Sequence, residues 1–446
     1  SARSEWFQAF LRGEEPYHDY FITGDPHADL SAVVRPRTSP LLTPVETSQG
    51  TKYVWTTFST DQIDLNFANP DVLLEIVDVL LGYIAHGARI IRLDAIAYLW
   101  KEVGTPCIHL PQTHAIVRLF RAVVDDVAPG VLIVTETNVP HEENIAYLGD
   151  GMNQAHIIYQ FPLPPLVAHA ILTGSARKLS AWAAGLETPS DRTAFLNFTA
   201  SHDGVGVRPA VGILSEDDLE ALIEQTRAHG GAVSYRTDAD GSTSPYELNI
   251  VYYDLLNPPD GSEPPALQVR RFLVSQAIML ALAGVPGIYF HSLFGSRNDY
   301  TGVRETGQAR AINREKLRLV PLMADLGEPG SRRRAVFYRY RHLIRKRISE
   351  QAFHPNGPQR VLAVDDSVFG LLRTAPTGGS AIVALHNITN SLRTLSLDLG
   401  PLGLHGARSF TDIITERSYA AEAPGKLIIH IEPYQALWLK PEGGTR

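Results

Sequence analysis

Three short apolar runs each end in a carboxylate, and helical sequence follows each of them. The runs are Ala88-Arg-Ile-Ile-Arg-Leu-Asp94, Val131-Leu-Ile-Val-Thr-Glu136 and Thr193-Ala-Phe-Leu-Asn-Phe-Thr-Ala-Ser-His202-Asp203. Strand-length apolar runs that alternate with helical periodicity are typical of parallel strands in βα units. The carboxyl ends of such strands lie on the face of a barrel where chemistry takes place, so we expect the three acids to share one mouth.

Helical periodicity fills much of the sequence between these runs. An apolar stripe over 72–81 follows Asn69, which is a suitable N-cap residue. Further helices are predicted over 113–127 and over 166–185, the second with a break at Gly174. The predicted fold class is therefore α/β, with a (β/α)8 barrel at its centre.

Residues 1–265 divide into three parts by pattern. Residues 1–60 are rich in aromatics, proline and charge and lack periodicity, which is typical of a functional excursion on a barrel. Residues 61–205 alternate strand and helix. Residues 206–265 form an insertion with an amphipathic helix and a hairpin, whose turn we predict at Asp240-Gly241.

The remaining sequence first returns to the barrel pattern and then leaves it. Residues 266–357 contain a nearly all-apolar helix over 268–283, which should be buried, and a last barrel strand over 285–290. From 358 to 446, short apolar runs are split by turns. This pattern predicts a separate all-β domain at the end of the chain.

Composition places the chain among ordinary globular proteins. Its 44% hydrophobic and 20% charged side chains are ordinary values. The length of 446 residues predicts several domains, and the formal net charge of −8 argues against a nucleic-acid partner. The basic segment 332–349 has apolar residues at helical spacing, so we interpret it as a barrel helix with a solvated face. No apolar run reaches membrane-spanning length and no signal peptide opens the chain, so we expect no membrane partner and a cytoplasmic location.

The sequence gives no sign of a cofactor. Cys107 is the single cysteine, so an internal disulfide is excluded and a reducing compartment fits. No glycine-rich nucleotide cradle is present, and no cluster has metal-ligand spacing. His109 and His114 lack a carboxylate partner in the sequence around them, so we interpret both as ordinary. We predict neither a cofactor nor a metal.

Four motifs, in their order and spacing, resemble the α-amylase superfamily (glycoside hydrolase family 13). They are Asp64-Leu-Asn66 with Asn69-Pro70, Arg92-Leu-Asp94-Ala-Ile-Ala-Tyr98, Glu136 in Val-Thr-Glu-Thr, and Ser201-His202-Asp203-Gly204. Within that superfamily the chain resembles the group of sucrose phosphorylases and sucrose 6′-phosphate phosphorylases. The stretch Trp100–Cys107 and the triplet Ile312-Asn313-Arg314 support this narrower resemblance.

The resemblance implies where these parts belong in the barrel. Members of the group begin with three more barrel strands, so 61–205 would hold strands 4–7, 266–357 strand 8, and 1–60 the excursion after strand 3. A barrel without three strands exposes long sheet edges and an apolar interior. We therefore expect the first strands to be supplied by a second chain or to be missing from this sequence.

The resemblance also implies catalytic roles. Asp94 would be the nucleophile, and Glu136 the general acid that later acts as the general base. Asp203 and His202 would bind sugar hydroxyls and stabilise the oxocarbenium-like transition state. Arg92, two residues before Asp94 on the same strand face, is suited to keep that carboxylate ionised and oriented.

A phosphorylase must hold phosphate where water would otherwise attack. The resemblance points to Arg37, Tyr98 and Tyr246 as phosphate contacts, and we add Arg35 and Glu247 as substrate-binding candidates. Two other interpretations stay open. Tyr98 would then be an ordinary packed tyrosine, and the two arginines a solvated pair on a coil.

The leaving group is predicted from the arginines that the other roles do not use. The surplus cations Arg35, Arg297 and Arg304 favour an anionic acceptor, with fructose 6-phosphate first and glycerate second, unless they are surface arginines. We thus predict a retaining α-glucoside phosphorylase that transfers glucose from sucrose 6′-phosphate or sucrose to inorganic phosphate, giving α-glucose 1-phosphate through a covalent glucosyl-enzyme. The alternatives are a glucosylglycerate or glucosylglycerol phosphorylase, a retaining α-glucosidase or transglucosidase, and a non-catalytic subunit.

Overall fold

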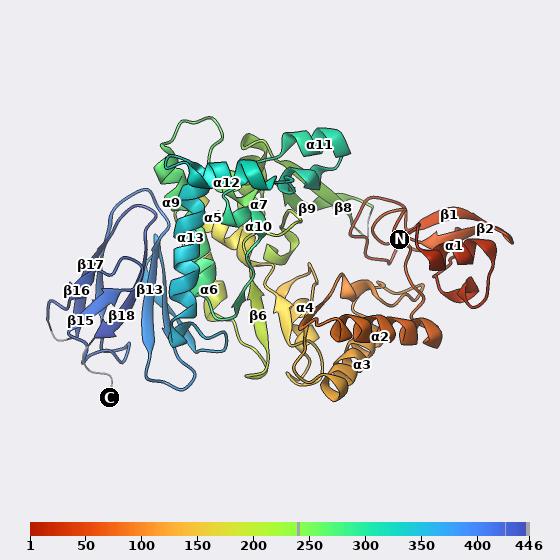
Figure 1. Ribbon diagram of the computed structural model, residues 1–446, viewed down its shortest axis with the longest axis horizontal. Coiled ribbons are helices and arrows are strands. Elements are labelled where there is room, and N and C mark those ends of the chain that lie inside the picture. The colour runs from red at the N-terminus through yellow and green to blue at the C-terminus, as the bar shows by residue number, and fades with distance from the viewer. Residues whose placement is uncertain (239–240, 424, 443–446) are drawn as a thin grey trace. The chain divides into compact units, whose positions relative to one another are not determined.

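The computed structural model describes residues 1–238, 241–423 and 425–442. The chain forms two compact units. Figure 1 shows its helices and strands, coloured by residue number. Unit 1 comprises residues 1–159 and 234–246, and unit 2 comprises residues 160–233 and 247–446. Among the described residues, none of the helices has both the length and the hydropathy that crossing a membrane requires.

Unit 1 begins with a small helix and hairpin. Helix α1 (Glu5–Arg12) starts at Ser4, whose side chain accepts from the backbone N of Phe7. Strands β1 (Leu42–Thr47) and β2 (Gly50–Trp55) pair antiparallel along their whole length. The predicted strand over 51–58 corresponds to β2, whereas its partner β1 was not predicted because a proline interrupts its apolar pattern.

The rest of unit 1 is built from βα units. Its elements are α2 (Pro70–Ala85), β3 (Ile90–Leu93), η2 (Ile96–Tyr98), α3 (Pro111–Val127), β4 (Leu132–Thr135), α4 (His141–Ile145) and β5 (Ile157–Tyr159). The side chain of Asn69 accepts from the backbone N of Asp71 and caps α2, as predicted. Strands β3, β4 and β5 pair in parallel and in chain order. The carboxyl ends of β3 and β4 therefore lie side by side.

Unit 2 contains the second set of parallel elements. They are α5 (Leu163–Thr173), α6 (Arg177–Ala184), β6 (Ala194–Asn197), α9 (Pro265–Ala281), β10 (Val285–Pro286) and α13 (Arg332–Ile348). Gly174 adopts a left-handed conformation at φ 67° and ends α5, which confirms the predicted break. The last barrel strand is shorter than the predicted 285–290, because the chain turns into helix α10 (Phe290–Leu293).

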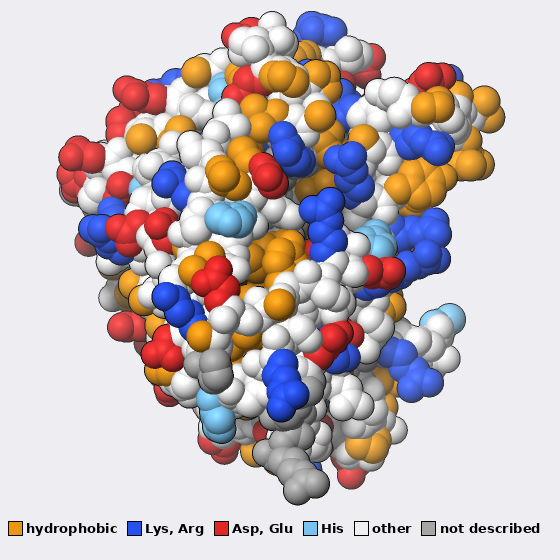
Figure 2. Space-filling view, turned by 90° about the vertical axis from the view of Figure 1, so that its left-hand side faces the viewer, with side chains coloured by type: hydrophobic (Ala, Val, Ile, Leu, Met, Phe, Trp, Pro, Cys, Tyr) orange, Lys and Arg blue, Asp and Glu red, His pale blue; other side chains and the backbone are white. Residues whose placement is uncertain are grey.

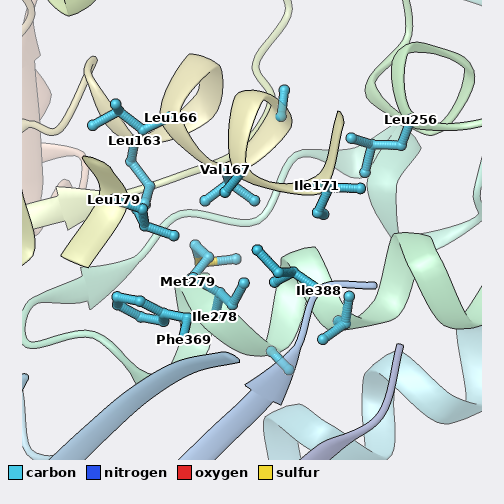
Figure 3. Close-up of a cluster of buried hydrophobic side chains, with 14 of the residues drawn as sticks. Leu163, Leu166, Val167, Ile171, Leu179, Leu256, Ile278, Met279, Phe369 and Ile388 are labelled. Carbon is cyan, nitrogen blue, oxygen red and sulfur yellow. The ribbon is translucent and has the colours of Figure 1, made fainter. Parts of the chain in front are cut away.

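The hydrophobic core of unit 2 lies where α5, α9 and the C-terminal sheet meet. Figure 3 shows Leu163 and Val167 from α5 facing Ile278 and Met279 from α9. Phe369 lies across from α5, on the side of Ile278. All five side chains are almost fully buried. Helix α9 is buried around most of its circumference, which is why its sequence lacks a polar stripe.

The inserted segment differs in part from its prediction. Strand β7 (Val205–Gly206) pairs with β9 (Thr243–Asn249), and a capping box formed by Ser215 and Asp218 begins helix α7 (Glu216–Ala228). Strand β8 (Ala232–Thr237) precedes β9. The chain leaves the extended conformation after β9 and forms helix α8 (Tyr252–Leu256). The predicted turn at Asp240-Gly241 lies partly outside the described residues.

The chain ends in antiparallel strands, as predicted. They are β11 (Gln359–Asp365), β12 (Val368–Thr374), β13 (Ala381–Asn387), β14 (Arg393–Asp398), β15 (Ser409–Asp412), β16 (Ser418–Ala420), β17 (Lys426–Ile431) and β18 (Ala436–Glu442). Six form one sheet in the order β11-β12-β13-β18-β15-β16, and β14 pairs with β17. Figure 2, viewed from the side of these strands, shows acidic and basic side chains interspersed, as on a solvated face.

Candidate active site

Two of the predicted acids meet at one guanidinium group in unit 1. Arg92 Nη1 lies 2.6 Å from Asp94 Oδ1, and Arg92 Nη2 lies 3.7 Å from Glu136 Oε2. The parallel pairing of β3 and β4 causes this meeting, because the backbone N of Glu136 donates to Leu93 O at 3.0 Å. The structure thus brings Asp94 and Glu136 together as the sequence predicted.

The two carboxylates have different environments. The Asp94 side chain is 69% exposed, whereas that of Glu136 is 13% exposed. The backbone N of Ala95 donates to Glu136 Oε2 at 3.0 Å, and Ala95 presents that N–H from a left-handed conformation at φ 48°. Because a donor to a carboxylate favours its ionised form, this contact suits a base at Glu136. Asp94 is open to an incoming substrate.

Arg92 is fixed on a second side by an aromatic ring. Its guanidinium carbon lies 5.5 Å from the centroid of Tyr159, at the end of β5. Burial lowers the pKa of Arg92, but the charges of Glu136 and Asp94 more than offset this and leave it raised. Burial raises the pKa of Tyr159. Arg92 therefore stays cationic between the two acids.

The predicted phosphate contacts form an aromatic cluster around one arginine, also in unit 1. The guanidinium carbon of Arg37 lies 5.0 Å from the ring centroid of Tyr246 and 5.7 Å from that of Phe58. Tyr98 packs edge-on against Phe58, with 5.5 Å between ring centroids. Phe58 was not predicted, since a lone phenylalanine after a strand carries no chemical signal. The cluster places a cation among aromatic walls.

Arg35 has a different environment from Arg37. Its Nη2 donates to Ser39 O at 2.7 Å, which closes a turn. It lines a cavity of about 770 Å³ whose wall also contains Leu30 and Leu41. Arg37 is not part of that wall. The two neighbouring arginines thus do not act as a pair of forks on one site.

The third predicted acid is held by two arginines in unit 2. Asp203 Oδ1 lies 2.7 Å from Arg310 Nη1 and 3.1 Å from Arg314 Nη2. Arg314 Nε also donates to His202 O at 2.7 Å. The His202 ring lies 3.8 Å from the Asp203 carboxylate and is exposed. Arg314 therefore holds the carboxylate of Asp203 and the backbone carbonyl of His202.

The buried carboxylate of Glu247 binds both Gly204 and Arg310, which are neighbours of Asp203. It is 1% exposed, and its Oε1 accepts from Gly204 N at 2.7 Å and from Arg310 Nε at 3.0 Å. Arg310 Nη2 donates to the other carboxylate oxygen. A Cβ on Gly204 would lie 2.4 Å from Leu248 O, so only glycine fits there. Arg310 thus links buried Glu247 to Asp203.

Asn313, in the triplet Ile312-Asn313-Arg314, holds the backbone around Asp203. Asn313 Nδ2 donates to Ser201 O at 2.6 Å and to Asp203 O at 2.9 Å. Arg310 was missed as a site residue, and Arg314 was read only as a mark of resemblance. The available signal was two arginines four positions apart around an asparagine, in a segment without helical periodicity.

The other surplus arginines have partners of their own. Arg297 Nε lies 2.8 Å from Asp254 Oδ1, whose side chain is 3% exposed. Arg304 Nη2 donates to Thr301 Oγ1 at 3.0 Å, on the surface of helix α11 (Tyr300–Thr306). Neither contact joins them to Asp203.

The described residues contain no group of three or more His, Cys, Asp or Glu side chains that could hold a metal ion.

His109 does have a carboxylate partner, contrary to the sequence-based reason for interpreting it as ordinary. Its Nε2 lies 3.0 Å from Glu143 Oε2, and its Nδ1 lies 2.9 Å from the Tyr147 hydroxyl. His114 instead contacts Gln154 Oε1 at 2.9 Å.

Comparison with known proteins gives a consistent set of matches. The family model described as "Alpha amylase, catalytic domain" matches residues 1–199. A glucosylglycerate phosphorylase of Allomeiothermus silvanus is 47% identical over 439 residues, which cover 98% of this chain and 75% of that protein. A sucrose phosphorylase of Agrobacterium vitis is 29% identical over 336 residues, which cover 70% of this chain and 64% of that protein.

Among solved structures, the chain is similar to sucrose 6F-phosphate phosphorylase from Thermoanaerobacter thermosaccharolyticum. The TM-score is 0.74 at 22% sequence identity, with 87% of this chain and 77% of that chain covered. Together with the family model, this match confirms the predicted (β/α)8 fold class with its C-terminal all-β part.

Proposed function

Because the chain belongs to the α-amylase family, in the group that includes the glycoside phosphorylases, we propose that it is a retaining glucosylglycerate phosphorylase. The proposed reaction transfers glucose from α-glucosylglycerate to inorganic phosphate and releases glycerate and α-glucose 1-phosphate. The first choice from the sequence was sucrose 6′-phosphate or sucrose as the glucose donor. We replace it with glucosylglycerate, because the glucosylglycerate phosphorylase is 47% identical to this chain and the sucrose phosphorylase 29%.

The observation that carries the proposal is the position of Arg92 between Asp94 and Glu136. A retaining enzyme needs two carboxyl groups about 5 Å apart, one as nucleophile and one as acid and base. One guanidinium group contacts both carboxylates here. Their unequal exposure divides the two roles. The open carboxylate can reach a sugar, whereas burial of Glu136 opposes the ionisation that the Ala95 amide favours, so that Glu136 can act as acid and then as base.

The reaction then has two displacements. Asp94 attacks the anomeric carbon while Glu136 donates a proton to the glycosidic oxygen, so that glycerate leaves and a glucosyl ester forms. In the second step a phosphate oxygen attacks that carbon, the ester bond breaks, and Glu136 takes up the phosphate proton. The Ala95 amide favours the ionised Glu136 that this second step requires.

Arg37 and the rings around it are the proposed phosphate contacts. Phosphate competes with water at about 55 M, so the site needs a fixed cation and walls that exclude water. Arg37 supplies the cation, and Tyr246, Phe58 and Tyr98 supply the walls and two hydroxyl donors.

Asp203 is the proposed sugar ligand of the oxocarbenium-like transition state. Two arginines contact its Oδ1 and hold the carboxylate in a fixed position. Glu247 is buried and fully engaged with Arg310 and Gly204. We therefore assign Glu247 to the support of Asp203 rather than to direct sugar contact.

Two further expectations bear on the proposal. The predicted partners, a sugar and inorganic phosphate, fit the relatives by name, whereas no comparison supports a second chain that completes the barrel. We keep a cytoplasmic location as part of the proposal, because the single cysteine needs no oxidising compartment.

A reverse-direction assay tests the function. The purified protein is incubated with α-glucose 1-phosphate and, in parallel, with glycerate, glycerol, fructose or fructose 6-phosphate, and phosphate release is followed. Release with glycerate as the preferred acceptor is the expected result, with an α-linked product by NMR. Preference for fructose or its 6-phosphate would restore the sucrose-type donor, and phosphate-independent release of glucose would point to a hydrolase.

A further inference from the structure

Two of the sequence motifs have no role in the proposed reaction so far, and they meet inside unit 1. Asp64 opens the motif Asp64-Leu-Asn66, and Lys101 lies in the stretch Trp100–Cys107. Lys101 Nζ lies 3.0 Å from Asp64 Oδ2, and the two side chains are 4% and 17% exposed. Lysine is almost never buried unless it is paired, so this ion pair is a built feature of the fold.

The cationic end of the ion pair is connected to Tyr98. Lys101 Nζ donates to the backbone carbonyl of Tyr98. The same nitrogen lies 5.8 Å from the centroid of the Tyr98 ring. Tyr98 is the last residue of η2, a single helical turn that begins two residues after Asp94. One ammonium group therefore holds both the main chain and the ring of Tyr98.

The anionic end of the ion pair is connected to the residue before Phe58. Thr57 is buried, and it donates its backbone N to Asp64 Oδ1 at 3.2 Å and its hydroxyl to Asp64 Oδ2 at 2.5 Å. The carbonyl of Phe58 accepts from Ser39 Oγ at 3.3 Å, two residues after Arg37. Phe58 is thus held between the ion pair and the segment that carries Arg37.

Phe58 and Tyr98 are neighbours in the aromatic cluster around Arg37. Their rings pack edge-on with 5.5 Å between the centroids, and the guanidinium carbon of Arg37 lies 5.7 Å from the Phe58 centroid. Each end of the ion pair therefore holds one of two adjacent walls. A change at either end shifts one wall against the other.

The surroundings of Lys101 are unsuited to direct phosphate binding. Its side chain is almost completely shielded from solvent, and its ammonium group already has a carboxylate and a carbonyl as acceptors. The charge of Asp64 also offsets that of Lys101 at the distance of the cluster. Any effect of Lys101 on phosphate therefore acts through the walls.

We propose that Lys101 and Asp64 are positioning residues for the phosphate contacts, an inference that rests on the proposed function. The ion pair keeps Tyr98 and Phe58 where they exclude water from the phosphate beside Arg37. A misplacement of about 1 Å can cost about 100-fold in rate. Loss of the ion pair should admit water to the glucosyl-enzyme, so that hydrolysis competes with phosphorolysis.

The partition of the glucosyl-enzyme between phosphate and water tests the proposal. In hydrolysis a water oxygen attacks the anomeric carbon, the ester bond to Asp94 breaks, Glu136 takes the water proton, and glucose leaves. The ratio of glucose 1-phosphate to glucose is measured with glucosylglycerate over a range of phosphate concentrations. This ratio does not depend on the fraction of folded enzyme. A purely structural ion pair would lower both products equally, whereas a positioning one lowers the ratio.

Lys101→Met should lower the ratio about fivefold and raise KM for phosphate by a similar factor. Release of fluoride from α-glucosyl fluoride in the first turnover should stay near normal, because it precedes the attack by phosphate. The matched control is Lys52→Met, which makes the same change on β2, where Lys52 Nζ lies 5.4 Å from the ring centroid of Phe10. This control should keep the native ratio.

A double variant keeps the test decisive if Lys101→Met fails to fold. Removal of the lysine alone leaves Asp64 shielded and without its cation, whereas replacing both members of a buried ion pair is often neutral for stability. Asp64→Asn combined with Lys101→Met should therefore be more resistant to urea than Lys101→Met alone. Its product ratio should still be lowered, because Tyr98 has lost the Lys101 donor.

The possible failures of the two proposals are distinguishable. A native protein that forms glucose 1-phosphate, together with an unchanged ratio in the single and double variants, would overturn the positioning role alone. An equal fall of the ratio in Lys52→Met would also overturn it. A native protein that forms only free glucose would overturn the proposed function, and the positioning role with it.

Discussion

Arg310 and Glu247 form a two-pronged ion pair in which Arg310 Nε donates to Glu247 Oε1 at 3.0 Å and Nη2 donates to the other oxygen. The third nitrogen of the same guanidinium, Nη1, lies 2.7 Å from Asp203. One side chain thus transmits the position of a buried carboxylate to the acid that we propose as the sugar ligand.

Arg310→Met should therefore reduce both stability and turnover. Removal of the arginine leaves Glu247 buried and unpaired, which costs about 3 kcal/mol of unfolding free energy. We expect kcat for phosphorolysis to fall about 100-fold as Asp203 loses its orientation. Urea unfolding and steady-state kinetics measure the two effects.

The control for this experiment is Arg304→Gln, which removes an exposed arginine of α11. It should keep normal stability and activity. Glu247→Gln separates charge from shape, and we expect a smaller loss than with Arg310→Met. Equal activity of Arg310→Met and the native protein would remove Arg310 from the positioning role.

Glu136→Gln should be rescued by a donor that needs no acid. General acid and base catalysis contributes about 10²–10⁴-fold, so phosphorolysis of glucosylglycerate should fall within that range. Release of fluoride from α-glucosyl fluoride in the first turnover should be nearly normal, because fluoride leaves without a proton, whereas later turnovers still need Glu136 as the base.

Asp94→Asn should lose turnover on both donors and keep its fold by circular dichroism. Retained turnover in Asp94→Asn would assign the nucleophile elsewhere.

Arg37→Gln should change the choice between phosphate and water. If Arg37 holds phosphate, the variant should raise KM for phosphate about tenfold or more and release a larger share of free glucose. The ratio of glucose 1-phosphate to glucose, measured over a range of phosphate concentrations, gives the effect. Arg35→Gln is the matched control, since Arg35 closes a turn and lines a different cavity. An unchanged product ratio in Arg37→Gln would contradict the assignment.

The sequence predicted the meeting of Asp94 and Glu136 better than it predicted the contacts around Asp203. Asp94 and Glu136 close adjacent parallel strands, so the strand pattern alone placed them together. Arg310 lies 63 residues after Glu247, and no local periodicity links the two. Such a pair depends on how loops fold back over strand ends, which propensity and spacing do not encode.

The fold shows the same division between regular and irregular segments. Long apolar stripes fixed α2 and α9, and Gly174 marked the break before α6. Strand β1 was not predicted because of its proline, and helix α8 was not predicted because the apolar residues of β9 continue into it. A short apolar run suits a strand or a buried helix equally well, so tertiary packing decides.

Acid should destabilise the protein through a histidine in the C-terminal sheet. His386 is fully buried on β13, its Nδ1 donates to Phe369 O at 3.0 Å, and its Nε2 accepts from Trp438 Nε1 at 3.4 Å. A ring that accepts at Nε2 is neutral. Burial lowers the pKa of His386 from 6.5 to about 4.

The sign of the effect follows from proton binding. Between pH 6.5 and about 4 the unfolded chain binds a proton at this residue that the folded chain excludes. The stability contribution is therefore complete above pH 6.5 and is lost as pH falls, at about 1.4 kcal/mol per pH unit. His386→Met should have lower stability at pH 7 but a shallower loss between pH 6.5 and 4, as measured by urea unfolding. The exposed His430 provides the control, because His430→Gln should keep the native slope, and an equal slope in His386→Met would show that other groups cause the acid sensitivity.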